Sequence, residues 1–430
     1  MTNIRALGGI GRALKIRNYR IYWLAAIQSL IVTWVQTVAT GWLAWQLTES
    51  PAWLGAIAFA EMAPTLLVSP LAGVFIDRRE PKQVLIATQI LLGVQATLLA
   101  VLTGVGWITA PFLLALSFVK GGILAFNHPA RLALVPMLVP KSELSTAIAI
   151  NSATFHGARF VGPAVAGLVI VWGGVAPAFA VNAATFFVLV TALTQIRLAP
   201  HLNAIRKSKA GVFADLAEGV GYLRHHDAIR SVLILLAAVA VVLQPYMDML
   251  PGFAADVFRE GADALAIMTA ATGLGAMCAA LWLAQRGTTE GLTRVVTRSL
   301  LAGIVGLFAF TATDQFIVAL PALAVVGFAF VATGTSAQIL LQNTVASEMR
   351  ARVMGIYGTI FLGGPAAGAL ILGAIASWVG LRPTVAGAAA VGCLAWLLTV
   401  PALRRVATVL ESGGLPVEAG ADSGSAQCRP

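Results

Sequence analysis

Charged residues and cysteines are scarce in this sequence of 430 residues. Asp, Glu, Lys and Arg together make up 11% of it, and the three cysteines, Cys278, Cys393 and Cys428, are not spaced as metal ligands or as a redox pair. No Gly-Lys dipeptide occurs, which excludes the phosphate-binding loop Gly-x-x-x-x-Gly-Lys-Ser/Thr. The His-Glu-x-x-His and Gly-x-Ser-x-Gly signatures of hydrolases are also missing. We therefore expect no disulfide, no metal site, no cofactor and no enzymatic activity.

Long apolar runs are abundant instead. Hydrophobic residues make up 59% of the chain and the mean hydropathy is +0.87. A helix needs about 20 apolar residues to cross a bilayer, and lipid offers no partner to an unpaired backbone amide, so repeated runs of that length indicate transmembrane helices. The first run is too long for a cleaved signal peptide and should be retained. The expected spans are 21–47, 54–76, 83–104, 110–127, 145–172, 176–196, 230–253, 263–284, 299–313, 316–341, 352–379 and 382–404.

An even number of spans puts both termini on one face of the membrane. Most of the 28 Lys and Arg residues fall in the segments on that face, whereas the opposite face has only Arg259 and Arg382. Because positively charged loops stay in the cytoplasm, both termini should be cytoplasmic in a multi-pass protein of the bacterial inner membrane. The net charge of +10 then reflects topology and attraction to anionic lipid heads, and we expect no nucleic-acid partner.

One connecting segment is longer than the others and divides the spans into two sets of six. Within it Phe213, Leu216, Val220 and Leu223 recur at helical spacing, which predicts an amphipathic helix on the inner membrane surface. A connector packed on the bundle would explain the same apolar stripe. The expected divisions are a cytoplasmic N-terminus (1–20), an N-terminal six-helix bundle (21–196), a linker with the amphipathic helix (197–229), a C-terminal six-helix bundle (230–404) and a disordered cytoplasmic tail (405–430).

The two sets of six resemble each other in sequence. Ser142-Glu143-Leu144 precedes the fifth span, and Gly162-Pro163-Ala164 lies inside it. Ser347-Glu348-Met349 and Gly364-Pro365-Ala366 hold the corresponding places around the eleventh span. Two six-helix repeats with a binding site between them are typical of secondary transporters.

A short segment rich in charged residues connects the second and third spans, and its sequence is Gly73-Val74-Phe75-Ile76-Asp77-Arg78-Arg79-Glu80-Pro81-Lys82. Gly73 lets the second span approach a neighbour closely. Asp77 stands at a helix C-terminus, where cations are favoured, so a neighbouring helix N-terminus or a cation such as Arg131 would suit it better. The corresponding segment of the second half, 281–286, has lost both the glycine and the acid.

This charged loop resembles the signature loop of the major facilitator superfamily, and the match extends over residues 15–405. The resemblance implies an all-α membrane protein with twelve transmembrane helices in two pseudo-symmetric six-helix bundles. It also implies a cytoplasmic gate in which Asp77 meets the start of the eleventh span. The alternative is that these charges only enforce topology. The expected gate residues are Gly73, Asp77, Arg78, Arg79, Lys82 and Arg131.

The fifth span resembles the superfamily's exporters. Its segment Gly162-Pro163-Ala164-Val165-Ala166-Gly167 is similar to their motif Gly-Pro-x-x-Gly-Gly, with Ala166 in place of the first closing glycine. Gly162, Pro163 and Gly167 then mark a functional bend, although a purely structural kink is the alternative. The segments 129–136 and 218–224 resemble the bacterial branch of transmembrane secretion effectors that contains the enterobactin exporter.

Four charged residues lie inside the expected spans: Glu61, Lys120, Arg159 and Asp248. Each costs at least about 2.5–3.5 kcal/mol at the bilayer centre, so such residues usually face a cavity or a partner. We expect Glu61 or Asp248 to carry a proton, with Lys120 or Arg159 as the charge partner. Static ion pairs that only hold helices together are the alternative.

Other polar and aromatic residues in the spans are weaker candidates for the substrate cavity, because polar side chains also hold helices together. These candidates are Gln28, Trp34, Gln36, Gln244, Tyr246 and Gln338.

These features predict a monomeric secondary transporter that exports a small siderophore or drug-like molecule by alternating access, driven by the proton gradient. The alternatives are proton-coupled uptake of a metabolite and a membrane receptor that transports nothing. The direction of transport in vesicles with an imposed proton gradient distinguishes them.

Overall fold

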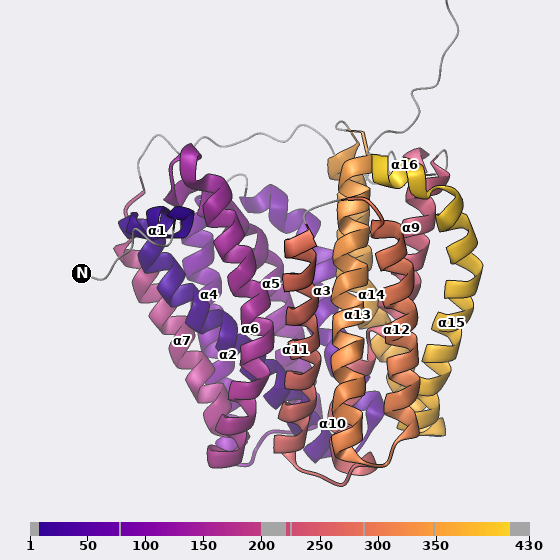
Figure 1. Cartoon of the computed structure of the whole chain (residues 1–430). Helices are drawn as coiled ribbons and strands as arrows, with labels where there is room; N and C mark the ends of the chain where they lie inside the picture. Colours follow the sequence, from indigo (N-terminus) through magenta and orange to yellow (C-terminus); the bar gives the residue numbers. More distant parts are fainter. Residues whose placement is uncertain are drawn as a thin grey trace, which may run out of the picture.

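A computed structural model describes residues 8–76, 79–198, 221–223, 226–286, 289–346 and 349–412. Over these residues the chain consists of helices joined by short connections (Figure 1). Of the linker helix predicted around Phe213, Leu216, Val220 and Leu223, only Leu223 lies among the described residues, in the helical segment 221–223, where it packs against the core. The rest of that helix and the tail beyond Ser412 lie outside the described residues. The segment 405–430 was predicted to be disordered, but Ala407–Ser412 forms a short helix. The helices of the N-terminal half are α1 (Gly8–Lys15), α2 (Arg17–Thr48), α3 (Pro51–Ile76), α4 (Pro81–Gly104), α5 (Ala110–Leu138), the 3₁₀ turn η2 (Lys141–Glu143), α6 (Leu144–Gly173) and α7 (Val175–Gln195).

The C-terminal half begins with a composite span in which α-helical and π-helical segments alternate. Its later helices are regular, and a short helix, α16, ends the described chain. The elements are α9 (Asp227–Ala238), η4 (Val239–Leu243), α10 (Tyr246–Gly252), η5 (Phe253–Val257), α11 (Ala262–Arg286), α12 (Leu292–Ala312), α13 (Phe316–Thr344), α14 (Arg350–Val379), α15 (Leu381–Arg405) and α16 (Ala407–Ser412).

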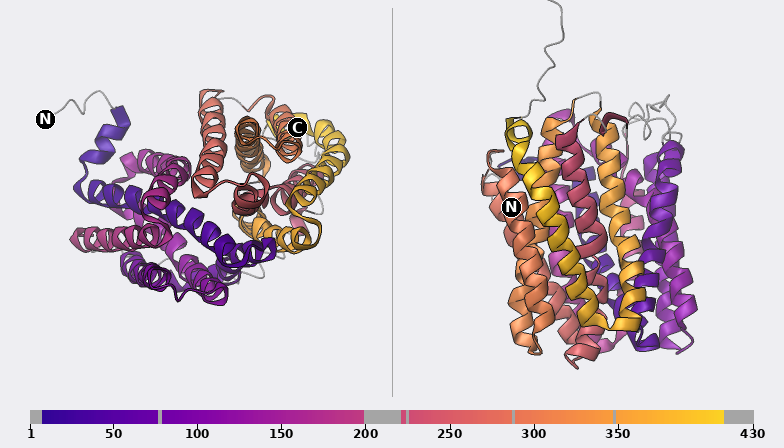
Figure 2. Two further views of the ribbon diagram at one scale, coloured as in Figure 1. Left: turned by 90° about the horizontal axis from the view of Figure 1, so that it is seen from below. Right: turned by 90° about the vertical axis from the view of Figure 1, so that its right-hand side faces the viewer.

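The helices form two bundles that stand side by side (Figure 2), as the fold prediction requires. Among the described residues, eleven helical segments are long and apolar enough to cross a membrane, and α6 adds the shorter apolar stretch Val161–Gly173. Helices α1 and α16 lie at the same end of the molecule (Figure 1), which we call the terminal face. The other end is called the opposite face.

The two bundles repeat the same local features. Pro163 lies inside α6 and Pro365 lies inside α14, the corresponding helix of the second bundle. Each of these helices ends at a glycine with positive φ, 82° at Gly174 and 95° at Gly380, before the next helix begins at once. Such backbone conformations favour glycine, so both bundles make the same tight turn with the same residue.

Two helix ends differ from the sequence prediction by more than four residues. Helix α5 continues to Leu138 instead of ending at 127, so Arg131 lies in a helix and not in a loop. The helix tolerates Pro129 and Pro136 because neighbouring groups can satisfy the backbone that proline frees within a bundle. Helix α12 begins at Leu292 and not at 299, because the long side chains of Arg294 and Arg298 can extend toward the terminal face from its first turns.

Candidate functional site

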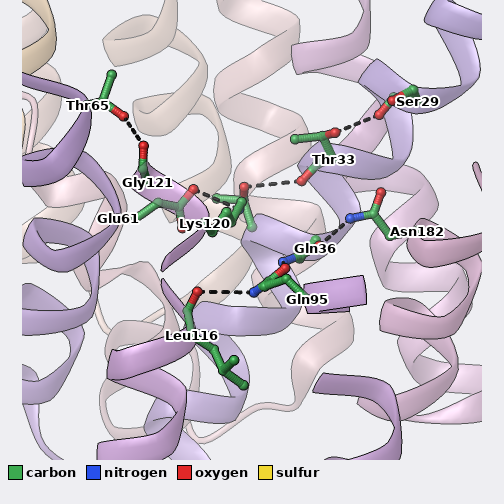
Figure 3. A network of polar contacts seen from close by, with 11 residues as sticks. Ser29, Thr33, Gln36, Glu61, Thr65, Gln95, Leu116, Lys120, Gly121 and Asn182 are labelled. Atoms are coloured by element: carbon green, nitrogen blue, oxygen red, sulfur yellow. Dashed lines mark hydrogen bonds and ion pairs between the residues drawn. The ribbon is translucent and has the colours of Figure 1, made fainter. Parts of the chain in front are cut away.

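Glu61 of α3 and Lys120 of α5 form an ion pair inside the N-terminal bundle (Figure 3). The Glu61 Oε1 atom lies 2.7 Å from Lys120 Nζ, and the two side chains are 15% and 2% exposed. The helices approach closely because the next residue is Gly121, where a Cβ atom would collide with the Glu61 carbonyl oxygen. Both charges lie ten residues from the opposite-face end of their helices, which is about 15 Å deep. The pair is therefore well inside the membrane-spanning part.

Asp248 brings a second carboxylate toward this pair from the C-terminal bundle. It lies on α10, between the π-helical segments η4 and η5, and π-helical turns are frequent at functional sites. Helix α10 contacts α2 and α3 across the junction of the bundles, and the charges of Asp248 and Glu61 are close enough to interact. We refer to Glu61, Lys120 and Asp248 together as the acid–lysine cluster. Glu61 and Lys120 are paired within one bundle, and Asp248 lies on an element of the other bundle that contacts α3. The side chain of Arg159, the other expected charge partner, lies outside the described part of the structure.

A network of amide side chains lies beside the cluster (Figure 3). Gln36 Nε2 donates a hydrogen bond of 3.3 Å to Gln95 Oε1, and Gln95 Nε2 donates one of 3.3 Å to the Leu116 carbonyl oxygen. Asn182 Nδ2 donates to Gln36 Oε1. These bonds join α2, α4, α5 and α7 within one bundle. Gln36 is 1% exposed, so its contacts are those of a residue that holds helices together, which was the alternative to a substrate contact.

The sequence prediction did not include Gln95 and Asn182. Both are polar residues inside apolar helices and both are buried, at 4% and 0% exposure. Their position in long apolar runs was the available signal, since a polar side chain in a span usually has a partner.

The predicted gate is described only in part. Lys82 Nζ donates a hydrogen bond of 2.7 Å to the Ile196 carbonyl oxygen and so joins α4 to the end of α7. The guanidinium carbon of Arg79 lies 5.7 Å from the ring centre of Phe75, and Arg131 is partly buried on α5. Asp77 and Arg78 lie outside the described residues, and Gly73 is described only as a helical position of α3. The gate therefore stays a prediction.

The glycines of the α6 motif stand at two close contacts. A Cβ atom at Gly162 would collide with the side chain of Trp34 on α2, in the same bundle. A Cβ atom at Gly167 would collide with the Cβ atom of Ala266 on α11, in the other bundle. Pro163 lies between them in the helix interior. The motif thus adapts α6 to neighbours on both sides, and Trp34 is one of those neighbours.

Helices α3 and α14 join the bundles through a second pair of glycines. A Cβ atom at Gly55 would collide with the Ala369 carbonyl oxygen, and one at Gly373 would lie 2.6 Å from the Pro51 carbonyl oxygen. Both contacts lie near the opposite-face ends of their helices. With the contact of Gly167 and Ala266, they show that the bundles meet tightly at the opposite face.

The remaining cavity candidates are dispersed. Gln28 is exposed, and its Nε2 atom donates to the carbonyl oxygen of Leu24 on the same helix at 3.2 Å. Tyr246 is buried against Phe330, with ring centres 5.8 Å apart. Gln338 Oε1 accepts a hydrogen bond of 3.5 Å from the Tyr357 hydroxyl. Gln244 is partly buried on the composite span. Their role in binding stays a prediction.

Sequence relatives of this chain include proteins named as efflux pumps and exporters. The family model described as transmembrane secretion effector matches residues 12–411. The multidrug efflux pump Tap of Mycolicibacterium fortuitum is 24% identical over 370 residues, covering 81% of this chain and 87% of that protein. The enterobactin exporter EntS of Shigella boydii serotype 4 is 24% identical over 383 residues, covering 87% and 88%.

Solved structures show the same fold. The nucleoside transporter NupG superposes with a TM-score of 0.69 at 13% identity, over 90% of this chain and 99% of that one. A bacterial homologue of the iron transporter ferroportin in an inward-facing state gives a TM-score of 0.66 at 15% identity, over 90% and 98%. At these identities the likeness concerns the fold alone.

Proposed function

Since this chain belongs to the transmembrane secretion effector family of the major facilitator superfamily, we propose that it exports a small molecule across the bacterial inner membrane in exchange for protons. The family consists of membrane transporters, not enzymes, and relatives named as efflux pumps and exporters favour the outward direction. One chain supplies both bundles, so a monomer suffices for transport. The relatives' names suggest an amphipathic drug or siderophore as the cargo.

The basic residues support a cytoplasmic terminal face. They gather in the connections on that side of the membrane, where the positive-inside rule favours them. The glycine contacts between α3 and α14 then close the outer face, as in an inward-facing transporter. Alternating access requires these contacts to separate in the outward-facing state.

The acid–lysine cluster is the observation that supports the proposal of proton coupling. Among the side chains that the structure describes, the two carboxylates share one ammonium group, so one negative charge of the cluster has no counter-charge there. An uncompensated charge inside the membrane is expensive, and a proton is the smallest ion that neutralises it. Because Asp248 belongs to one bundle and Glu61 to the other, movement of the bundles changes their separation. Opening of the outer face would therefore change which acid holds the proton.

Transport by the wild-type protein in inside-out vesicles tests the direction. A macrolide and enterobactin serve as probes together with ethidium, because Macrolide efflux protein A of Streptococcus pyogenes, which is 20% identical over 348 residues, and EntS are named for these two molecules. We expect accumulation of at least one of them when the vesicle interior is acidified, and loss of accumulation when a protonophore collapses the gradient. Depletion of the vesicle interior under the same gradient would indicate uptake into the cell and contradict the proposal.

A further inference from the structure

A groove on the surface of the N-terminal bundle is separate from the acid–lysine cluster. Its volume is about 450 Å³, and it lies between the end of α3, the first half of α4 and the middle of α5. Leu91 and Val119 line it and are 53% and 49% exposed although they are apolar. In a membrane protein such residues face hydrocarbon, so the groove opens toward the lipid.

The groove changes in polarity along its length. Arg79 and Gln83 line its terminal-face end, and both are exposed. Leu91 lies eight residues after Gln83 on α4, which is about 12 Å deeper into the membrane. Phe75 and Phe126 form a wall at an edge-to-face ring distance of 5.7 Å. The lining thus begins with a guanidinium group and continues with apolar side chains.

Arg79 is held at the mouth of the groove. Its guanidinium carbon lies 5.7 Å from the Phe75 ring centre, a cation–π distance. Gln83 donates a hydrogen bond of 2.7 Å to Glu80, so its amide is already engaged. Among the described residues of the lining, Arg79 carries the charge, and it is suited to bind phosphate because its planar donors match phosphate oxygens.

We propose that this groove binds an anionic phospholipid, with the phosphate on Arg79 and one acyl chain along Leu91 and Val119. The order of groups in the groove, cation at the membrane surface and apolar side chains below it, is the order of groups in such a lipid. A soluble anion would leave the apolar part unused, and an uncharged hydrophobic molecule would leave Arg79 unused. If the terminal face is cytoplasmic, as proposed above, the lipid belongs to the inner leaflet, where anionic headgroups attract basic side chains.

Lipid binding to the purified full-length protein tests this site directly. Native mass spectrometry would follow titration with phosphatidylglycerol and with phosphatidylcholine of the same acyl chains. We expect tighter binding of phosphatidylglycerol, and a loss of at least fivefold in its affinity in Arg79→Gln. Gly122→Leu should weaken both lipids, because Gly122 lines the groove and its Cβ would meet no atom closer than Pro64 Cβ at 4.0 Å. The Cβ atom of the new side chain therefore fits at this position without a close contact.

Arg20→Gln is the matched control, since Arg20 is an exposed arginine of the same membrane face on α2. It should leave phosphatidylglycerol affinity unchanged. Gel filtration of each variant checks that it is folded before lipid is added. Equal binding of the two lipids by the wild type, or unchanged phosphatidylglycerol affinity in both Arg79→Gln and Gly122→Leu, would overturn the proposal. The readout is binding, so it stands apart from the transport experiment.

Discussion

Lys120 determines the electrostatics of the acid–lysine cluster. Its side chain is 2% exposed, and the carboxylate of Glu61 is its partner at 2.7 Å. The desolvation cost of such a buried pair can exceed the attraction between its charges, so the pair itself is weak evidence for stability. Removing one partner is different, because the other charge is then buried without compensation. Function and stability can therefore be separated by single and double substitutions.

Lys120→Met should destabilise the protein by about 3–5 kcal/mol, the usual cost of breaking a buried pair. Adding Glu61→Gln to Lys120→Met removes the uncompensated charge and should restore most of the thermal stability. The double variant should still fail to transport, because it retains neither the lysine nor the acid. Thermal unfolding in detergent and transport in vesicles measure the two effects. Full transport by the double variant would show that the pair only holds helices together.

The sequence predicted which residues carry charge inside the spans but not which of them meet. The depth of Glu61 and Lys120 follows from their place in apolar runs. Their orientation around the helix does not, because lipid and protein interior are about equally apolar and leave little periodicity to read. Gln36 illustrates the consequence: the sequence shows a polar residue in a span, and only the structure shows that Gln95 and Asn182 surround it.

At the scale of elements, α16 holds the terminal-face end of the second bundle together. Glu411 accepts hydrogen bonds from the backbone amides of Gly291, the N-cap residue of α12, at 2.7 Å and of Thr293 in its first turn at 3.0 Å. The carbonyl oxygen of Leu410, a residue that is 0% exposed, accepts a hydrogen bond of 3.3 Å from Thr344 Oγ1 on α13. Glu411 thus supplies, from a distant part of the chain, the negative charge that a helix N-terminus favours.

Glu411→Gln should destabilise the protein by about 1 kcal/mol near neutral pH, a typical loss for a helix cap. Burial raises the pKa of Glu411, but hydrogen bonds from Gly291 and Thr293 and the charge of Arg294 lower it further, so the net shift is downward. A lowered pKa stabilises the folded state above the ordinary carboxylate pKa, and this contribution is lost as the pH falls through the folded-state value.

The difference in melting temperature between wild type and Glu411→Gln should therefore be present at pH 7 and shrink below about pH 4.5. Glu290→Gln, at an exposed acid one residue before Gly291, is the control and should change little. A difference that persists at acidic pH would show that the carboxylate charge is not what stabilises the helix end.

The contact of α3 with α14 should control which conformation the protein adopts. Gly55→Leu places a side chain where even a Cβ collides with the Ala369 carbonyl oxygen, so the outer face cannot close fully. We expect a shift toward the outward-facing state, measured as larger distances between spin labels at the outer ends of the two bundles. Gly355→Leu is the control, since a Cβ there meets nothing within 4 Å. An unchanged distance distribution in Gly55→Leu would exclude this contact as the outer closure.

The helix boundaries show which features of the helices can be predicted from the sequence and which cannot. Length and hydropathy located the spans, because a bilayer demands about 20 apolar residues from each. The same criterion ended α5 too early, at 127, because it treats Pro129 and Arg131 as the start of a loop. A bundle can satisfy the backbone groups that proline frees, and this tertiary compensation is invisible in a local window.

The whole molecule combines two repeats that have diverged. Both keep the proline in the middle of one helix and the glycine turn after it, at Gly174 and Gly380. The charged loop survives in the first repeat, whereas the second relies on Glu411. The acid–lysine cluster likewise draws two members from the first bundle and one from the second. In the proposed mechanism, transport depends on a charge balance that neither bundle provides alone.

Proton movement coupled to substrate is the most direct test of that claim. In inside-out vesicles acidified by respiration, a transported probe should dissipate part of the pH gradient, seen as recovery of acridine-dye fluorescence. We predict that Glu61→Gln and Asp248→Asn each reduce this recovery at least tenfold, whereas Asp263→Asn, at an exposed acid in the first turn of α11, leaves it unchanged. Undiminished recovery in both Glu61→Gln and Asp248→Asn would contradict the assignment of proton coupling to the acid–lysine cluster.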